Sequence, residues 1–558
     1  MGHILQQLTR ELRQPGNVTI ETPEFFNFGF DVIDYFAREA DKVAYIAVDA
    51  SGQQVREHRF SDLSRASNRV ANVLRQLGVE RGDSAIVILP RVPAWYEVMV
   101  GCIKAGVVSL PGTTLLTTKD IEYRINKAQA SIAIVGIEQA EKIEQLGDAC
   151  PGLKHLILVD EEREGWLCYS QACAQAEETL DSAQIGGPTR SDELMLAFFT
   201  SGTTANPKMV PHVHSYALAH LVTGTFWLDL NESDVHWTLS DTGWAKAAWG
   251  VLFAPLVCRA ATVLYDGGAG FDADIHLRLL SKLQVSTFCA PPTIYRLFAQ
   301  MDLSQYDLGS IRHSISAGEP LNPEVIRVWR DVTGTTVHDG YGQTETVNIV
   351  ANVPGMDIRL GSMGKAVPGF DVQIVDDDGK AVADDEIGHI AVRLTDPLPL
   401  GLFAGYFEGP DSRSRDSFRH GWYYTGDTAT RDADGYIWFV GRSDDVISSA
   451  AYRISPFEVE SVLLQHDAVA ESAVVAKPDP LRGHIVKACV VLASGHSPSE
   501  ALAEELMAFV KTTTAPYKYP REIEFRQQLP KTISGKIRRV ELRQQAEREA
   551  SSAGKATQ

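Results

Sequence analysis

Short apolar runs alternate with helix-like segments in the first third of the chain. The clearest runs, AIVIL, SIAIV and HLILV, lie at residues 85–89, 131–135 and 155–159. A helix-like segment lies at residues 96–105, and another at 61–77 carries apolar residues at the spacing of one helix face, namely Val70, Val73, Leu74 and Leu77. Gly78 follows the latter, where a glycine commonly ends a helix. The alternation predicts parallel sheets covered by helices, and therefore an α/β fold.

Composition and charge disfavour several classes of protein. The 558 residues are 44% hydrophobic and 22% charged, which is ordinary for a globular enzyme of two to four domains. The formal net charge of -20 repels nucleic acids and anionic membranes, so we expect neither as a partner. The seven cysteines are scattered and include no CxxC pair, which predicts reduced thiols without zinc or disulfides. We find no targeting signal and no apolar run that spans a bilayer, and therefore expect a cytoplasmic protein.

The pattern changes near the C-terminus, where a charged turn precedes a predicted hairpin and a marked helix start. Ser455 and Glu458 have the spacing of a capping box, and Pro456 occupies the first helical position. Apolar residues at 502, 506, 509 and 510 indicate a second helix, and a basic segment follows at 531–539. We therefore predict a boundary at Asp444 between a large domain, 1–443, and a small one, 444–558. The small polar residues at 550–558 predict disorder.

The strongest local motif is LMLAFFTSGTTANPK at residues 194–208, in which an apolar strand runs into hydroxyl residues, a glycine and a lysine. Gly202 lets backbone N–H groups approach phosphates, and Lys208 supplies a positive charge. The hydroxyl groups that can donate to phosphate oxygens belong to Thr200, Ser201, Thr203 and Thr204. Neither a Walker loop nor a GxGxxG sequence is present. The alternative interpretation is a Ser/Thr-rich turn with a solvated lysine.

A second motif, HDGYGQTET at residues 338–346, places two glycines around Tyr341 and a lone acid, Glu345, after a short polar run. The aromatic ring can stack on a base while the carboxylate holds Mg²⁺ on phosphate oxygens. The alternative is a glycine turn with an exposed glutamate. The segment SAGEPLNPEV at 316–325 is weaker evidence, because Pro320 after Gly318 and Glu319 is also what a helix entry contains.

Two further motifs lie toward the C-terminus. In residues 422–445, Asp427 follows a glycine turn, and its carboxylate can accept both hydroxyls of a ribose. Arg442 precedes two acids and can contact the same nucleotide or a phosphate. A turn aspartate and a salt-bridged arginine are the alternative. In LPKTISGKIRR, Lys536 lies on a predicted loop, where a lysine can neutralise charge on an attacked α-phosphate, although most basic surface segments are only solvated.

Taken together and in this order, these motifs resemble the adenylate-forming superfamily of acyl-CoA synthetases, luciferases and peptide-synthetase adenylation domains. The resemblance covers residues 61–539. Within the superfamily, SDTGWAKAAWG at 240–250, VGRSDDVI at 440–447 and TAPYKYPREIEF at 514–525 look most like medium-chain acyl-CoA synthetases. The resemblance implies a large N-terminal domain of helix-covered sheets and a small, mobile C-terminal α+β domain.

The resemblance also implies roles for individual residues. ATP would be bound by the loop from Thr200 to Lys208 and by a second set, namely Gly318, Glu319, Asp339, Gly340, Tyr341, Gly342, Gln343, Thr344, Asp427 and Arg442. CoA would be bound by Ala450, Ala451, Tyr452, Arg453, Arg482 and Tyr519. The catalytic residues would be Lys208, Glu345 and Lys536, with Glu345 as the Mg²⁺ ligand. Asp444 would be the hinge, and Gly243 and Trp244 would line the acyl pocket.

These assignments predict an ATP-dependent acid:CoA ligase. A carboxylate attacks the α-phosphate in line, Mg²⁺ and Lys536 offset the developing charge, and pyrophosphate leaves. Rotation about Asp444 then withdraws Lys536 and brings the hairpin at Ala451 to the site, where the CoA thiol attacks the acyl-AMP. The chain departs from the family at Ala205 and Ala451, where glycine is usual. By the resemblance, the methyl group of Ala451 would lie beside the path of the pantetheine arm of CoA and narrow it, so we expect it to affect the thioester step more than adenylation.

Two other functions stay open. One is an enzyme that transfers the acyl group to the thiol of a carrier protein. Arg453 and Arg482 favour CoA over such a carrier as the acceptor. The other is an inactive nucleotide-binding regulator, for which Ala205 and Ala451 are the only support. As for the acid, Trp244 at the far end of the pocket predicts a short, branched or compact aromatic substrate, beside the medium-chain acids of the resemblance. The alternative is a tryptophan that simply packs in the core.

Overall fold

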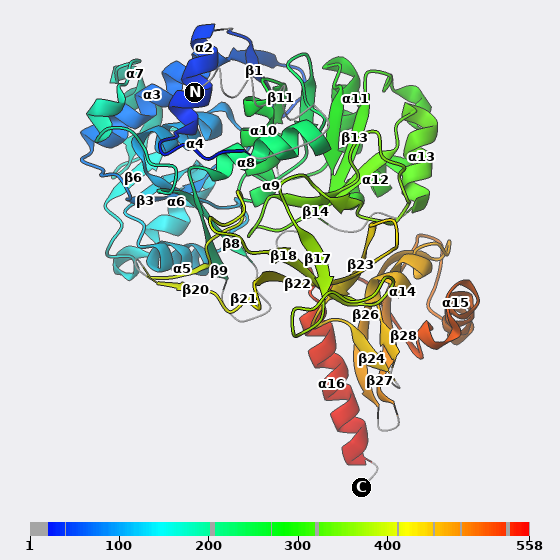
Figure 1. The fold of residues 1–558 in the computed structure, drawn as a ribbon. Helices are drawn as coiled ribbons and strands as arrows, with labels where there is room; N and C mark the ends of the chain where they lie inside the picture. Colours follow the sequence, from blue (N-terminus) through cyan, green and yellow to red (C-terminus); the bar gives the residue numbers. More distant parts are fainter. Residues whose placement is uncertain are drawn as a thin grey trace. The chain divides into compact units, whose positions relative to one another are not determined.

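The computed structural model describes residues 20–39, 41–200, 207–268, 270–318, 323–409, 412–449, 452–479, 482–531 and 536–556. The chain forms two compact units (Figure 1). The first comprises residues 1–371 and 394–416, and the second comprises 372–393 and 417–558. The predicted mixed α/β fold, with a large N-terminal sheet domain and a smaller C-terminal one, is confirmed. The hinge at Asp444 stays a prediction.

One sheet of the first unit has seven strands. They are β3 (Ser84–Ile88), β4 (Val108–Pro111), β5 (Ile132–Val135), β6 (His155–Leu158), β7 (Leu167–Cys168), β8 (Leu194–Thr200) and β9 (Lys208–Val213). Their order is β7-β6-β5-β3-β4-β8-β9, and only β9 runs antiparallel to its neighbour. The associated helices are α3 (Phe60–Gln76), α4 (Pro93–Ala105), α5 (Thr118–Ala128), α6 (Ile137–Glu144) and α7 (Tyr169–Gln175). The three apolar runs form β3, β5 and β6, and the helical repeat forms α3, so these predictions are confirmed.

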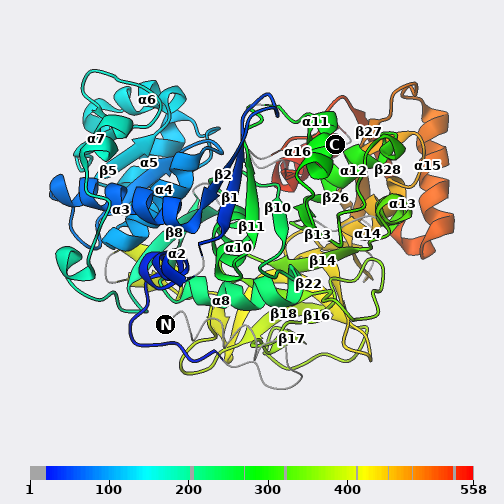
Figure 2. The same cartoon turned by 90° about the horizontal axis from the view of Figure 1, so that it is seen from above.

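The other large sheet of this unit has nine strands. They are β1 (Val43–Val48), β2 (Val55–Arg59), β10 (Val235–Thr238), β11 (Ala261–Tyr265), β12 (Thr287–Ala290), β13 (His313–Ala317), β14 (Val337–Gly342), β15 (Asn348–Ala351) and β16 (Lys365–Ala366). Their order is β16-β15-β14-β13-β12-β10-β11-β1-β2, and the strands from β14 to β1 are parallel (Figure 2). Besides short π- and 3-10-helices, the unit also contains α2 (Tyr35–Glu39), α8 (Tyr216–Val222), α9 (Ala245–Ala247), α10 (Ala254–Val257), α11 (Ala273–Lys282), α12 (Pro292–Ala299), α13 (Pro323–Thr333), β19 (Tyr406–Gly409) and β20 (Ser412–Ser414).

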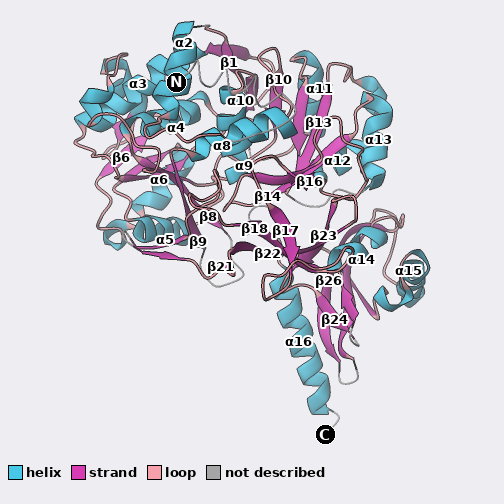
Figure 3. Cartoon of the chain, in the orientation of Figure 1, coloured by secondary structure: helices cyan, strands magenta, loops and turns pink. Residues whose placement is uncertain are grey.

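Both faces of the nine-stranded sheet are covered by helices (Figure 3). Successive side chains of a strand point to opposite faces, so Leu264 and Cys289 pack into one apolar cluster and Val263 and Phe288 into another. The first cluster includes α8 and α10, and the second includes α11, α12 and α13. Apolar residues on both faces are typical of parallel strands that helices cover on both sides.

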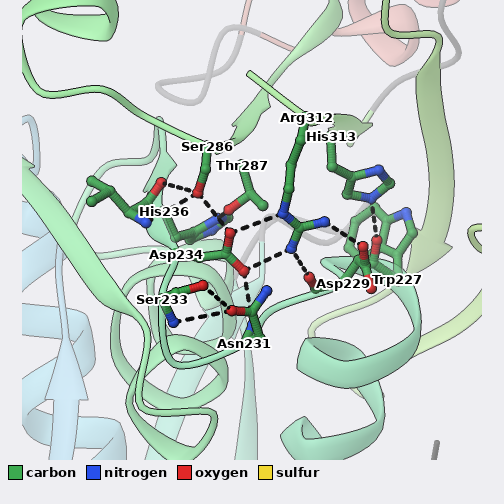
Figure 4. A network of polar contacts seen from close by, with 11 residues as sticks. Trp227, Asp229, Asn231, Ser233, Asp234, His236, Ser286, Thr287, Arg312 and His313 are labelled. Atoms are coloured by element: carbon green, nitrogen blue, oxygen red, sulfur yellow. Dashed lines mark hydrogen bonds and ion pairs between the residues drawn. The ribbon is translucent and has the colours of Figure 1, made fainter. Parts of the chain in front are cut away.

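A closed polar network lies at the amino ends of β10, β12 and β13 (Figure 4). Arg312 donates to both carboxylate oxygens of Asp234, from Nε at 2.9 Å and from Nη2 at 2.7 Å. The same carboxylate accepts from Ser286 Oγ at 2.7 Å and from the Asn231 backbone N–H at 2.8 Å. Burial alone would raise the pKa of Asp234, but these hydrogen bonds hold it below its ordinary value. The network ties the starts of three strands together.

The second unit contains an antiparallel five-stranded sheet, a hairpin and a three-stranded sheet. The five strands are β17 (Val372–Val375), β18 (Gly388–Arg393), β21 (Phe418–Arg419), β22 (Trp422–Arg431) and β23 (Ile437–Arg442). The hairpin is β24 (Ile447–Ser449) and β25 (Tyr452–Ile454), and the three-stranded sheet is β26 (Val469–Asp479), β27 (Gly483–Leu492) and β28 (Glu522–Arg526). The helices are α14 (Pro456–Leu463), α15 (Glu500–Thr513) and α16 (Arg539–Ala556).

The C-terminal predictions are mostly confirmed. The hairpin, α14 with Pro456 in its first turn, and α15 are all present. The Ser455 side chain accepts from the Glu458 backbone N–H at 3.2 Å, but the Glu458 carboxylate bonds to Lys518 at 2.6 Å instead of closing a capping box. The prediction of disorder from residue 550 is wrong as far as Ala556, because α16 extends to that residue, and its alanines favour a helix.

Candidate functional site

The predicted phosphate loop connects two antiparallel strands of the first unit. Thr200 ends β8, Lys208 begins β9, and the two residues are paired across the hairpin. The Thr200 hydroxyl donates to the Lys208 carbonyl at 3.5 Å. Ser201, Gly202, Thr203 and Thr204 lie outside the described residues, as does the departure at Ala205. The described ends place the loop between the two strands of a hairpin, and the predicted phosphate-binding lysine is the first residue of the second strand.

Tyr406 lies between two of the predicted catalytic residues. Its hydroxyl donates to Glu345 Oε1 at 2.8 Å, and the Lys208 ammonium group lies 4.5 Å from the centre of its ring. A cation over a tyrosine ring is attracted by the electrons of the ring face. The structure therefore brings the lysine and the carboxylate to one side chain, although they are far apart in the sequence. Sequence reasoning missed Tyr406, because a single tyrosine in a polar segment gives no signal of this contact.

Backbone contacts hold the turn that carries Glu345. The Phe403 backbone N–H donates to the Glu345 carbonyl at 2.9 Å, and His212 Nε2 donates to the Thr344 carbonyl at 2.7 Å. Burial lowers the pKa of His212 to about 4, so this histidine is neutral near pH 7. Glu345 itself is 9% exposed. The strand that begins with Lys208 thus also fixes the predicted Mg²⁺ ligand, through His212.

The predicted adenine-binding residues meet at the carboxyl ends of β13 and β14. Register pairs Ala317 with Gly340, so Gly318 follows β13 beside the Tyr341 position of β14. Gly318 has a φ of +107°, which side-chain-bearing residues rarely adopt. A Cβ on Gly340 would lie 2.4 Å from Trp227, and one on Gly342 would lie 2.4 Å from the Val347 carbonyl. Glu319 lies outside the described residues. Carboxyl ends of parallel strands are the usual place for a ligand in such folds.

Asp339 has unusual electrostatics for a surface-reaching carboxylate. Loss of solvation raises its pKa to about 8, although the Gly340 backbone N–H donates to its Oδ1 at 2.9 Å and part of the residue is exposed. The carboxyl group is therefore largely protonated at neutral pH. It can donate a hydrogen bond to a ring nitrogen as well as accept one.

The predicted acyl-pocket residues follow a tightly docked turn. A Cβ on Gly243 would lie 2.0 Å from the Thr113 nitrogen, so the two backbones pass too close for any other residue. Asp241 accepts from the Thr113 hydroxyl and from the Gly243 N–H, both at 2.8 Å. Trp244 precedes α9 and is partly exposed, not buried in the core. The turn therefore fixes the position from which the indole extends.

Asp427 and Arg442 form an ion pair in the second unit. They face each other on β22 and β23, with Arg442 Nη1 3.2 Å from Asp427 Oδ1. The aspartate side chain is 6% exposed and the arginine side chain 46%. This contact agrees with the alternative interpretation of the sequence, in which Arg442 only forms a salt bridge. It is also compatible with ribose binding, because a carboxylate accepts several hydrogen bonds.

The predicted hinge residue is held by the C-terminal helix. Arg543 of α16 lies 3.3 Å from the Asp444 carboxylate and also donates to the Asp444 carbonyl and the Asp445 carboxylate. Burial raises the pKa of Asp445, and Arg543 opposes that shift. Lys536 is exposed and lies just before α16.

The predicted CoA-binding residues are dispersed over the second unit. The Tyr452 ring stacks on Tyr517 with centroids 4.2 Å apart. Tyr519 lies under the guanidinium group of Arg521, 4.9 Å from its ring centre. Arg453 is exposed, and the Arg482 backbone N–H donates to Asp479. Ala450 and Ala451 lie outside the described residues. The predicted CoA-binding residues that the structure describes therefore provide aromatic rings and positively charged side chains.

The predicted site residues can hold a magnesium ion only together with the phosphates of a bound nucleotide. Within the described ranges, no group of three or more His, Cys, Asp or Glu side chains could hold a metal ion by itself. Mg²⁺ is usually bound through one or two carboxylates and substrate phosphates, and Glu345 supplies such a carboxylate. Among the residues that the structure describes, no helix is long and apolar enough to cross a membrane.

Comparisons with known proteins agree with these features. The sequence is 44% identical to the mouse acyl-coenzyme A synthetase ACSM3, mitochondrial, over 94% of this chain and 91% of that protein. The anthranilate CoA ligase AuaEII, solved with anthranoyl-AMP, matches with a TM-score of 0.85 and 34% identity over 95% of this chain and 99% of that one. A benzoate CoA ligase from Burkholderia xenovorans matches with a TM-score of 0.79 and 29% identity over 93% and 100%.

Two family models match the sequence itself. The AMP-binding enzyme model matches residues 34–407, which is more than half of the chain. The model of the AMP-binding enzyme C-terminal domain matches residues 458–536. The chain belongs to the AMP-binding enzyme family.

Proposed function

We propose that this protein is an ATP-dependent acid:CoA ligase that forms an acyl-AMP intermediate and then an acyl-CoA thioester. The observation that carries the proposal is the cluster of Lys208, Tyr406 and Glu345 at the phosphate hairpin. A cation and a lone carboxylate held on one side chain suit a triphosphate and its metal ion. The similarity to an acyl-coenzyme A synthetase and two CoA ligases supports the same reaction.

In this proposal, the residues of the chain first bind and orient ATP, and a different part of the C-terminal domain then faces the site. Lys208 and the loop before it hold the phosphates, Asp339 to Thr344 line the adenine, and Asp427 accepts the ribose hydroxyls. A Mg²⁺ ion bound by Glu345 and the phosphates would neutralise phosphate charge. Lys536 stabilises charge on the α-phosphate while the acid attacks and pyrophosphate leaves. A rotation about Asp444 then replaces Lys536 with the β24–β25 hairpin, where CoA reacts and AMP is released.

The acid is a medium-chain, short branched or aromatic carboxylic acid in this proposal. The names of two structural relatives, which are ligases of anthranilate and benzoate, support the aromatic class. We also propose a cytoplasmic protein, on the basis of its scattered reduced thiols. The mitochondrial location in the name of the mouse relative is a property of that protein.

Acid-dependent exchange of pyrophosphate into ATP, screened over these acids, tests the proposal. We expect exchange with at least one acid and release of AMP when CoA is added. Exchange without CoA-dependent AMP release would favour a carrier-protein acceptor. A chain that binds ATP but exchanges with none of the acids would favour the inactive regulator.

The Lys536→Ala variant divides the two half-reactions. We expect adenylate formation to fall about 100-fold or more, with thioester formation from a supplied acyl-adenylate mostly intact. Lys531→Ala is a matched control, because Lys531 belongs to the same basic segment but pairs with Glu471 at 2.8 Å. Equal losses of Lys536→Ala in the two assays would refute the division of labour.

A further inference from the structure

Helix α5 contacts the phosphate hairpin and is itself anchored at its start and along one face. Thr117 and Asp120 close a capping box before its first turn. Ile121 and Ile125 are buried in an apolar cluster with residues of the seven-stranded sheet, and Phe199 of β8 packs against the same cluster. A capped helix with one face in the core is a rigid support for the segments beside it. The side chains at the edge of α5 therefore contact the hairpin from a fixed position.

Tyr123 of α5 bonds to the residue that immediately precedes the predicted phosphate-binding lysine. Its hydroxyl donates to the Pro207 carbonyl at 2.9 Å. Proline has no backbone N–H, so the carbonyl is the backbone group through which a hydrogen bond can hold this residue. The register between β8 and β9 has Thr200 and Lys208 as its outermost pair, so Pro207 lies just outside the ladder. The bond of Tyr123 thus fixes how the chain enters β9, and with it the origin of the Lys208 side chain.

Two further residues of α5 contact the neighbouring strands. The Arg124 guanidinium group lies 5.3 Å from the centre of the ring of Phe199, which precedes the last residue of β8. The Lys127 ammonium group lies 3.5 Å from the carboxylate of Glu408 on β19, the strand that begins with Tyr406. Glu408 is more than half exposed, so this ion pair contributes little by itself. One helix therefore contacts β8, the entry to β9 and β19, and its hydrogen bond lies next to the lysine.

We propose that Tyr123 is a positioning residue for ATP binding, because its hydroxyl sets the place from which Lys208 reaches the phosphates. This inference rests on the function proposed above, through the role of Lys208. A lysine side chain is a flexible four-carbon stem, so the reach of its ammonium group depends on where its Cα is held. Loss of the bond leaves Lys208 charged but less well placed, which weakens its attraction for the triphosphate in the ground state and the transition state alike. The expected result is a higher KM for ATP with nearly unchanged kcat.

Calorimetric titration of the full-length protein with ATP and Mg²⁺ tests the proposal. Acid and CoA are left out so that no turnover occurs. We expect Tyr123→Phe to weaken ATP binding about fivefold, as for one neutral hydrogen bond. Tyr265→Phe is the matched control, because the Tyr265 hydroxyl also donates to a backbone carbonyl, that of Ala50 at 3.2 Å. The control should bind ATP like the wild type, and both variants keep the aromatic ring that packs in the fold.

A double-mutant cycle with Lys208→Gln separates positioning from a general structural role. If Tyr123 acts through Lys208, Tyr123→Phe should weaken ATP binding about fivefold in the wild-type background but less than about twofold in the Lys208→Gln background. In the ligase assay, Tyr123→Phe should raise KM for ATP while kcat and KM for the acid change by less than about twofold. A purely structural role would not confine the effect to ATP or make it depend on Lys208.

Equal effects of Tyr123→Phe in the two backgrounds would overturn the proposal, and so would an equal loss of ATP binding in Tyr265→Phe. Unchanged ATP binding in Tyr123→Phe would overturn it as well. A wild type that binds ATP but exchanges pyrophosphate with none of the acids would refute the ligase function. The binding cycle would still decide the role of Tyr123 in that case, so the two proposals fail separately.

Discussion

The two ends of the nine-stranded sheet use polar residues in opposite ways. At the amino ends, Asp234 and Arg312 are bonded to each other, and Ser286 completes the shell around the carboxylate. At the carboxyl ends, glycines alternate with single polar residues, and Glu345, which follows β14, meets Lys208 of the seven-stranded sheet on Tyr406. The first arrangement uses its donors within the protein, whereas the second holds a cation and a carboxylate that both contact Tyr406.

This difference separates residues that stabilise the fold from residues that are placed to bind a ligand. An ion pair that is closed on itself, as at Asp234, contributes to the fold and offers little to a ligand. Polar groups that glycine turns and a tyrosine hold at the ends of strands are positioned to bind a ligand. Changes at the amino ends should therefore alter unfolding, and changes at the carboxyl ends should alter turnover.

The largest expected effect is on stability, from Arg312→Ala. The change leaves the buried Asp234 carboxylate without its cation, and we expect a loss of about 3 kcal/mol, at the low end for buried pairs because the arginine is 37% exposed. The folded pKa of Asp234 lies below its unfolded value, so the pair stabilises above that unfolded value and is lost as pH falls through the folded pKa. Urea unfolding should therefore show a larger loss at pH 7 than near pH 3.

Two comparisons check this assignment. Arg278→Ala removes an exposed arginine that pairs with Asp274 in the same unit, and it should change stability little. Adenylation per folded molecule of Arg312→Ala should match the wild type. A large drop in that activity with unchanged unfolding would contradict the structural role of the amino ends.

The second effect is on turnover, from Tyr406→Phe. The substitution keeps the ring under Lys208 but removes the donor to Glu345, so we expect adenylation kcat/KM to fall by about tenfold, as for a hydrogen bond to a charged group. The melting temperature should change little. Tyr306→Phe is the matched control, because Tyr306 donates to Asp274 at 2.6 Å away from the site. Similar losses in both variants would contradict a specific role for Tyr406.

The sequence predicted what depends on local pattern. Apolar runs gave the strands β3, β5 and β6, and the i, i+3, i+4 spacing gave α3, because each signal lies within one element. The pairs Arg312–Asp234 and Tyr406–Glu345 join residues 78 and 61 positions apart, and no local pattern marks them. Glu458 had the right spacing for a capping box, but Lys518, sixty residues away, competes for its carboxylate.

The candidate site followed the same division. Lys208 and Glu345 were predicted from motifs, and the structure adds Tyr406, which contacts both of them, while their roles stay predictions. The raised pKa of Asp339 could not be predicted, because it depends on the surroundings of the carboxyl group in the fold. The roles of Asp427, Asp444 and Lys536 stay predictions of the resemblance.

The smallest expected effect concerns the acid, and comes from Trp244→Ala near the carboxyl-end site. Gly243 packs its backbone against Thr113, so the indole extends from a fixed position, and its partial exposure argues against a purely structural role in the core. If the indole closes the acyl pocket, removing it admits additional methylenes, each of which is worth about 0.8 kcal/mol. The preference in kcat/KM should then shift toward longer chains by about fourfold per added methylene. Trp244→Phe should shift the profile less, since a phenyl ring fills more of the space. A Trp244→Ala variant that melts like the wild type and keeps its chain-length profile would show that this residue does not limit the pocket.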